Sequence, residues 1–311
     1  MGVVIVLVCH SGVPRNKGGA GKARESTSAE ENFLVVQRGV CAFTIAAKAP
    51  RGTERGGRMS EMQVQDAAGE ATGLSQWQRV TNTFAAPAKT FEDINRGNRS
   101  WWLPLILISV AAYLFFAVVA TKIGMQQVVD NQIHMNPAQE ERMAQASPEQ
   151  RETGAKIALY ITEGIFAATP VITLGVLALL SLGLMGTINF GFGGKAKYSS
   201  VLAVWLYSIL PSLVKTLLGI VVIYSGVAPE SFNIKNFAPT NLGAFLNPLE
   251  TNKALYALTT SLDAVQIWSL VLLSIGIATV AGVKRSSGYI AVFGWWAIFV
   301  LFGVGMAAMM G

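Results

Sequence analysis

Five long apolar stretches alternate with polar segments from about residue 100 to the end of the chain. Each stretch is long enough to cross a lipid bilayer, which takes about 20 residues in a helix. We predict membrane-spanning helices over about 101–121, 165–190, 200–225, 256–283 and 288–310. The pattern therefore favours an all-α fold, a polytopic transmembrane bundle of five spans.

Composition agrees with a membrane protein. Of the 311 residues, 52% are hydrophobic and only 14% are charged, whereas a soluble domain carries about 25% charged residues. The formal net charge is +6, but residues 1–58 hold 9 Lys and Arg against 4 Asp and Glu, which leaves 15 and 14 for the rest. No basic groove remains after that division, so we expect no nucleic-acid partner.

Residues 1–58 differ from the remainder. They are rich in small and polar residues, and they contain both cysteines, Cys9 and Cys41, at a spacing that matches no metal or redox motif. Met59 opens an ordinary acidic amino terminus. We interpret Met59 as the natural start and residues 1–58 as an over-extended gene prediction; the alternative is a genuine but disordered tail.

The loops between the expected spans alternate in charge. Lys195 and Lys197 lie in the short loop after the second span, and Lys284 and Arg285 lie in the short loop after the fourth, with no acid in either. The two long loops are mixed or acidic. By the positive-inside rule, the amino terminus is cytoplasmic and the carboxyl terminus lies outside. We therefore expect a multi-pass protein of the cell membrane, the inner one in a bacterium.

Short helices are expected outside the spans. In the cytoplasmic region 59–100, one amphipathic helix would turn Phe84, Phe91 and Ile94 toward the lipid or toward the bundle. In the first long loop, two helices are expected, the second entering span 2 after Ser147 and Gln150 at capping-box spacing. The second long loop, rich in Asn, Pro and Gly, is expected to fold back over the outer face.

Two charges interrupt the apolar runs. Lys215 in the third span and Asp263 in the fourth fall at nearly the same depth, in the outer half of a ~30 Å core. Each would continue a polar stripe at helical spacing, made of Ser208, Ser212 and Lys215 on one span and of Thr259, Asp263 and Gln266 on the other. We predict that the two stripes face each other. The pair is then either a salt bridge that orients the spans or an ion or proton site.

No catalytic motif for a nucleophile, a metal or a nucleotide occurs in the chain. We expect no catalytic residue, no cofactor and no metal ligand, and the protein is not expected to be an enzyme. The glycine-rich "NFGFGGKAK" follows a span rather than a strand, which makes it a turn at the interface. Phe84, Phe91, Lys195 and Lys197 form the expected cytoplasmic interface.

Several motifs in their order resemble the Yip family, the Ypt-interacting, Yip-domain membrane proteins, in its bacterial form. They are the Phe84–Ile94 lead, "WWLPLIL" at the first span, "NFGFGG" after the second, "SLD" with "IW" at Ser261–Trp268 and "FGWW" at Phe293–Trp296. The resemblance covers about residues 80–311. It implies a five-span, non-enzymatic protein over 101–311.

In eukaryotes this family works in membrane traffic and binds Rab GTPases. The cytoplasmic region here is short and lacks the motifs of those members, so the resemblance does not extend to a Rab-type partner. We expect the lipid bilayer and either a second copy of the chain or another membrane protein as partners. The resemblance thus favours membrane organisation or partner binding. The alternative is a small transporter or channel that uses Lys215 and Asp263.

Overall fold

A computed structural model describes residues 73–309. The long apolar helices are α3 (Trp102–Lys122), α7 (Thr169–Gly186), α8 (Tyr198–Ser208) with α9 (Ser212–Tyr224), α11 (Ala264–Ala281) and α12 (Arg285–Met309). A π-helical turn, η1 (Thr187–Gly191), extends α7. These make five helices long and apolar enough to cross a membrane. The prediction of an all-α, five-span fold is confirmed. Predictions that concern residues 1–58 or Met59 lie outside the described part.

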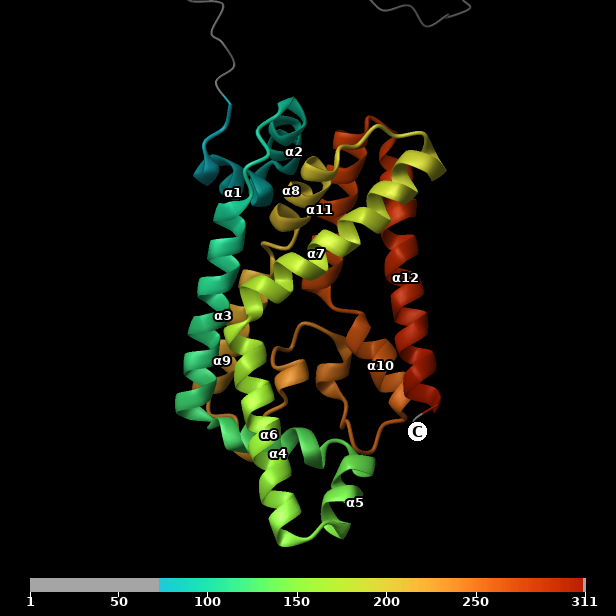
Figure 1. The fold of residues 1–311 in the computed structure, drawn as a ribbon. Helices are drawn as coiled ribbons and strands as arrows, with labels where there is room; N and C mark the ends of the chain where they lie inside the picture. The colour runs from blue at the N-terminus through green and yellow to red at the C-terminus, as the bar shows by residue number, and fades with distance from the viewer. Residues whose placement is uncertain (1–72, 310–311) are drawn as a thin grey trace, which may run out of the picture. The chain divides into compact units, whose positions relative to one another are not determined.

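The spans run alternately between two ends of the bundle (Figure 1). One end carries α1 (Gln76–Ala85), α2 (Pro87–Arg96) and the short loops 192–197 and 282–284. We call it the α1–α2 end. The opposite end carries α4 (Met125–His134), α5 (Pro137–Gln145) and the start of α6 (Pro148–Ala167). We call it the α4–α5 end, and the last residues of α12 lie toward it.

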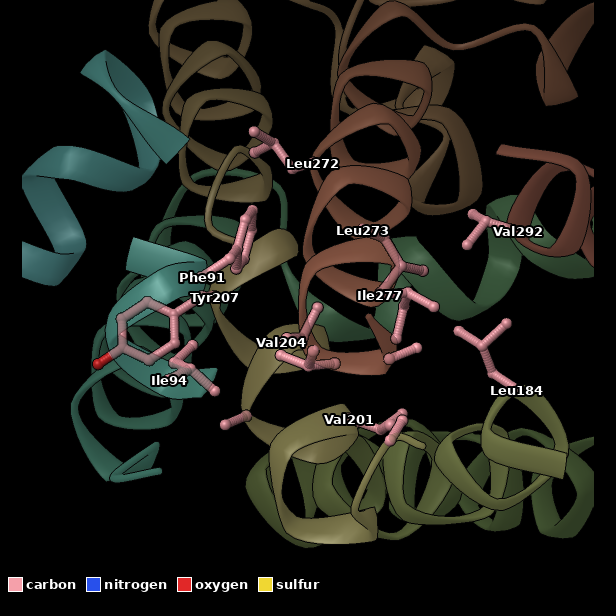
Figure 2. Packing of buried hydrophobic residues seen from close by; sticks show 14 of the residues in the cluster. Phe91, Ile94, Leu184, Val201, Val204, Tyr207, Leu272, Leu273, Ile277 and Val292 are labelled. Carbon is pink, nitrogen blue, oxygen red and sulfur yellow. The ribbon is translucent and has the colours of Figure 1, made fainter. Parts of the chain in front are cut away.

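The core lies where α2, α8 and α11 meet (Figure 2). Phe91 of α2, Val204 of α8 and Ile277 of α11 are fully buried there. Gly276 permits the close approach, because a methyl group at that position would lie 2.5 Å from Val204 Cγ1 and 2.9 Å from Phe91 Cδ1. This packing fits the general use of small residues where membrane helices come closest together.

Two spans are broken. The predicted helix over 256–283 is interrupted at Leu262 and Asp263, which separates α10 (Lys253–Ser261) from α11. This corrects the expectation of one continuous span. The third span breaks between Ser208 and Ser212, where Pro211 has no N–H to donate along the helix.

The segment before the first span is two helices rather than one. Ser75 caps α1 in a capping box with Gln78, and Pro87 begins α2. The apolar side of this segment was expected to face either the lipid or the bundle. It faces the bundle, because Phe91 and Ile94 are fully buried. Phe91 is therefore a core residue and is not available to a cytoplasmic interface.

The α4–α5 end is more structured than the sequence indicates. The capping box of Ser147 and Gln150 is present at the start of α6, which leads into α7 as expected. Helix α4 was not anticipated. The buried side chain of Asn131 in α4 donates to the carbonyls of Pro229 and Phe232, and so fastens the second long loop to this helix.

The second long loop contains three 3₁₀ turns, η2 (Pro229–Ser231), η3 (Ile234–Asn236) and η4 (Leu242–Phe245). It enters the bundle instead of lying flat on it. The ring of Phe237 packs 4.5 Å from that of Phe115 in α3, seven residues, or about 10 Å, before the end of that helix. Irregular backbone at such a depth is tolerated in a membrane only where protein covers it.

Candidate functional site

Asp263 lies at the break in the fourth span and is the N-cap of α11. Its Oδ1 accepts the backbone N–H groups of Val265 at 2.9 Å and Gln266 at 3.0 Å. Its Oδ2 accepts Lys215 Nζ at 2.8 Å and the Thr240 hydroxyl at 2.5 Å. A carboxylate has about four acceptor positions, so every acceptor position of Asp263 is occupied.

Lys215 lies on α9 and reaches Asp263 across the gap between the two spans. Its side chain is 27% exposed, against 4% for Asp263. The ammonium group also lies 5.7 Å from the centre of the Phe237 ring. An ammonium carries three donors, and Asp263 is the single hydrogen-bond acceptor that the described residues offer to it. Two N–H groups of Lys215 are therefore available.

The ion pair holds the second long loop in place. Asn241 and Asp263 form an isolated antiparallel bridge, and the N–H of Ala264 donates to the carbonyl of Thr240 at 2.9 Å. Buried Asn241 exchanges side-chain hydrogen bonds with Asn236. The pair thus joins both broken spans and the loop between them in one polar cluster.

The other predicted stripe residues are only partly brought together. Ser212 and Gln266 lie with the ion pair around one cavity. Ser208 is buried, and its hydroxyl has no hydrogen-bond partner within the described residues. Thr259 donates to the carbonyls of Leu255 and Tyr256 in its own helix, α10. Because the break at Asp263 separates α10 from α11, the single stripe of Thr259, Asp263 and Gln266 does not exist.

The cavity beside the ion pair has a volume of about 470 Å³. Its walls come from α7, α8, α9, α11 and α12, and they are mainly leucine and aromatic side chains, including Trp205, Trp295 and Trp296. At one edge, Trp295 donates its indole N–H to the hydroxyl of Thr187 at 2.9 Å, which ties α12 to the end of α7. Apolar cavities with a few polar groups are the usual form of small-molecule sites.

A second buried charge cluster lies at the α1–α2 end. Arg79 is 1% exposed, and it donates to the carbonyls of Asn98 at 2.8 Å and Ser100 at 3.1 Å. Its guanidinium lies 5.4 Å from the centre of the Tyr207 ring, and its Nε lies 3.6 Å from an oxygen of Asp93. Arg79 was not singled out from the sequence.

The two short loops at the α1–α2 end form one surface. The N–H of Lys195 donates to the carbonyl of Ala281, which brings loop 192–197 against loop 282–284. Lys195 and Lys197 are exposed as expected. We call Phe190 and the four exposed cations beside it the cationic patch, made of Phe190, Lys195, Lys197, Lys284 and Arg285. Phe190 is 94% exposed, and Phe84 is also exposed at its edge-on contact with Trp268.

Neither cluster resembles a metal centre. Within residues 73–309, no group of three or more His, Cys, Asp or Glu side chains could hold a metal ion. His134 lies on the exposed surface at the α4–α5 end, 2.8 Å from Glu140.

In the described part of the chain, five apolar spans, two of them broken beside the Lys215–Asp263 ion pair, define a polytopic helical membrane protein. A family model for the Yip1 domain matches residues 81–307. That range is most of the chain, so the chain belongs to the Yip1 domain family. No significant match is found among curated proteins or among solved structures.

Proposed function

We propose that the protein is a non-enzymatic component of the cell membrane that organises the bilayer or binds a partner through the α1–α2 end. The cationic patch carries this proposal. Four cations and a nearly fully exposed phenylalanine lie in or directly beside two short loops that contain no acid. Such a patch attracts anionic lipid headgroups or an acidic protein segment, by about 1 kcal/mol per cation near a charged membrane.

The same charges support the orientation. With the cationic patch in the cytoplasm, the positive-inside rule places the α4–α5 end and the carboxyl terminus outside. The membrane would then be the inner membrane of a bacterium. A single cysteine introduced at Ser286 should react with a membrane-impermeant thiol reagent only after the cells are opened, whereas one at Glu141 should react in intact cells.

Photocross-linking in membranes tests the proposed surface. A photoreactive amino acid at Phe190 should give a discrete adduct, and replacing the four cations of the cationic patch by glutamine should reduce its yield at least tenfold. The matched position is Leu301, which is exposed on α12 but far along the chain from the cationic patch. Equal adducts at Phe190 and Leu301, unchanged by the glutamine substitutions, would contradict the proposal.

The ion pair supports a structural part in this function. All four acceptor positions of Asp263 are used within the protein, which leaves the carboxylate no free position for a passing ion. On this basis, we assign Lys215 and Asp263 to holding the third and fourth spans together.

A small transporter or channel is the second candidate, and the two breaks in spans 3 and 4 favour it. Interrupted spans near the midplane are typical of transporter binding sites. Reconstitution in vesicles separates the candidates. Proton or ion flux that exceeds empty vesicles and disappears in the folded Lys215→Ala, Asp263→Ala double variant would favour transport. Flux at the level of empty vesicles is the result that we expect.

A further inference from the structure

The cavity beside the ion pair is better suited to lipid than to water. Its lining contains three tryptophans, and most of the remaining wall is leucine, valine and phenylalanine. Two lining residues, Leu179 of α7 and Phe299 of α12, are also strongly exposed on the outside of the bundle, at 71% and 50%. They mark a mouth between α7 and α12 that faces sideways, into the region that a bilayer occupies.

Lys215 brings free donors to this cavity. Two of its N–H groups have no acceptor among the described residues. Asp263 cannot serve them, because four other donors already fill its oxygens. A ligand that supplies oxygen atoms would therefore be stabilised here.

These observations point to one class of ligand. We propose that the cavity holds an acyl chain of a membrane lipid, which enters between α7 and α12 and places an oxygen of its polar group on Lys215. The oxygen can belong to the carboxylate of a free fatty acid or to the ester or phosphate of a phospholipid, since all three accept from an ammonium. A volume of about 470 Å³ lies within the ~300–1,000 Å³ that ligand cavities usually have.

The proposal explains the difference in exposure between the two charges. Asp263 is enclosed on all sides by donors from its own chain, whereas Lys215 keeps part of its surface toward the cavity. Asp263 thus holds the two spans together, whereas Lys215 holds them together and also contacts the ligand. This site is separate from the cationic patch at the α1–α2 end.

Photoreactive lipids test the proposal on the purified full chain in detergent. One probe is a fatty acid with a diazirine near the end of its chain, and the other is a diacyl phospholipid with the same group. The adducts are mapped by peptide mass spectrometry. We expect labelling of the cavity walls at Leu184 or Trp296, and we expect excess unlabelled lipid to compete with it. The probe that labels identifies the source of the acyl chain.

Two matched variants on α7 control for non-specific lipid contact. Leu180→Trp fills the cavity that Leu180 lines, and Leu182→Trp adds the same group at an exposed position outside that lining. Labelling of the cavity walls should fall at least tenfold in Leu180→Trp and stay unchanged in Leu182→Trp. Labelling that is spread evenly over the outer helix surfaces, cannot be saturated and is equal in both variants would overturn the proposal. If Leu180→Trp does not fold, saturable competition in the unaltered protein decides the question.

The role of Lys215 needs a variant that keeps the fourth span capped. Lys215→Met with Asp263→Asn removes both charges, and asparagine remains a good N-cap residue. We expect this protein to fold and to label at least fivefold less at the cavity walls. Undiminished labelling in the folded variant would contradict the part assigned to Lys215.

Discussion

Two ion pairs with buried carboxylates, Arg79–Asp93 and Lys215–Asp263, satisfy their cations in different ways within the described residues. Arg79, at the α1–α2 end, donates to two backbone carbonyls and lies over an aromatic ring, so that Asp93 at 3.6 Å is one neighbour among several. Lys215 has Asp263 at 2.8 Å as its one hydrogen-bond partner among the described residues. Backbone carbonyls and an aromatic ring hold Arg79 in place, whereas the carboxylate of Asp263 holds Lys215 in place.

This difference follows from the chemistry of the side chains. Arginine presents five donors in a rigid plane, which suits a site with several fixed carbonyls, and lysine presents a compact charge on a flexible stem. The arginine cluster ties the segment before the first span to the bundle. The lysine pair leaves two donors free beside a cavity. Both cations keep donors without a hydrogen bond among the described residues, but the Nε of Arg79 is buried, whereas Lys215 lines a cavity, and Lys215 is therefore the better candidate for binding a ligand.

The largest effect is expected at Arg79. Arg79→Met should lower the free energy of unfolding by about 3–5 kcal/mol, because the change leaves the buried carboxylate of Asp93 without its cation and removes the donor to the carbonyls of Asn98 and Ser100. Thermal unfolding of the purified protein in detergent measures it. Arg96→Met, at an exposed position on α2, is the control and should stay within about 0.5 kcal/mol of the original protein. If Arg79→Met were as stable as Arg96→Met, the Arg79 cluster would not stabilise the fold, and its contrast with the Lys215 pair would be lost.

The next effect is expected at Asp263. Asp263→Ala should cost about 2–3 kcal/mol, because it removes an N-cap and leaves Lys215 without its anion. Asp263→Asn should cost about half as much, since asparagine still accepts the N–H groups of Val265 and Gln266. Thermal unfolding followed by circular dichroism gives both values. An asparagine variant as unstable as the alanine variant would show that the charge alone matters.

A smaller effect is the coupling between the two partners. Lys215→Ala combined with Asp263→Ala should be less damaging than the sum of the two single changes, with a coupling of about 1–2 kcal/mol. Thermal unfolding of the original protein, the two single variants and the double variant, under identical conditions, measures this coupling. Strictly additive losses would mean that the contact of 2.8 Å does not stabilise the bundle.

Sequence reasoning reached the lysine pair but not the arginine cluster. Lys215 and Asp263 stand out because each interrupts a long apolar run. Arg79 lies in a polar segment where a charge is ordinary, and only the fold brings it under Tyr207, more than a hundred residues later. The five spans were predictable in the same way, because long apolar runs can be recognised from neighbouring residues alone.

The break at Asp263 shows what local pattern cannot provide. Apolar residues continue on both sides of Asp263, so hydropathy predicts one continuous helix across this position. A signal did exist, because Asp263 followed by Gln266 has the spacing of an N-cap and its N3 residue. What makes the break stable is Thr240, from a loop that hydropathy alone cannot place.

The smallest effect is expected at Tyr207. Its hydroxyl donates to Gln76 Oε1 at 2.9 Å and lies 3.2 Å from the carbonyl oxygen of Ser100. Tyr207→Phe should cost about 0.5–1.5 kcal/mol, the usual net value of one hydrogen bond. Tyr289→Phe is the control, because the Tyr289 hydroxyl forms no hydrogen bond within the described residues. A loss above the range would indicate that Tyr207 supports Arg79 as well as its own contacts.

The separation of Lys215 and Asp263 along the chain has a consequence during biosynthesis. Asp263 comes 48 residues after Lys215, so at about 5–20 residues per second the ribosome makes the aspartate some 2–10 seconds after the lysine. Throughout that interval the third span carries a charge whose anion has not yet been made. Insertion of this span therefore has to wait for the fourth, or has to proceed with the ammonium turned toward water or toward the insertion machinery. The pair that holds the finished bundle together thus also constrains how the third span can enter the membrane.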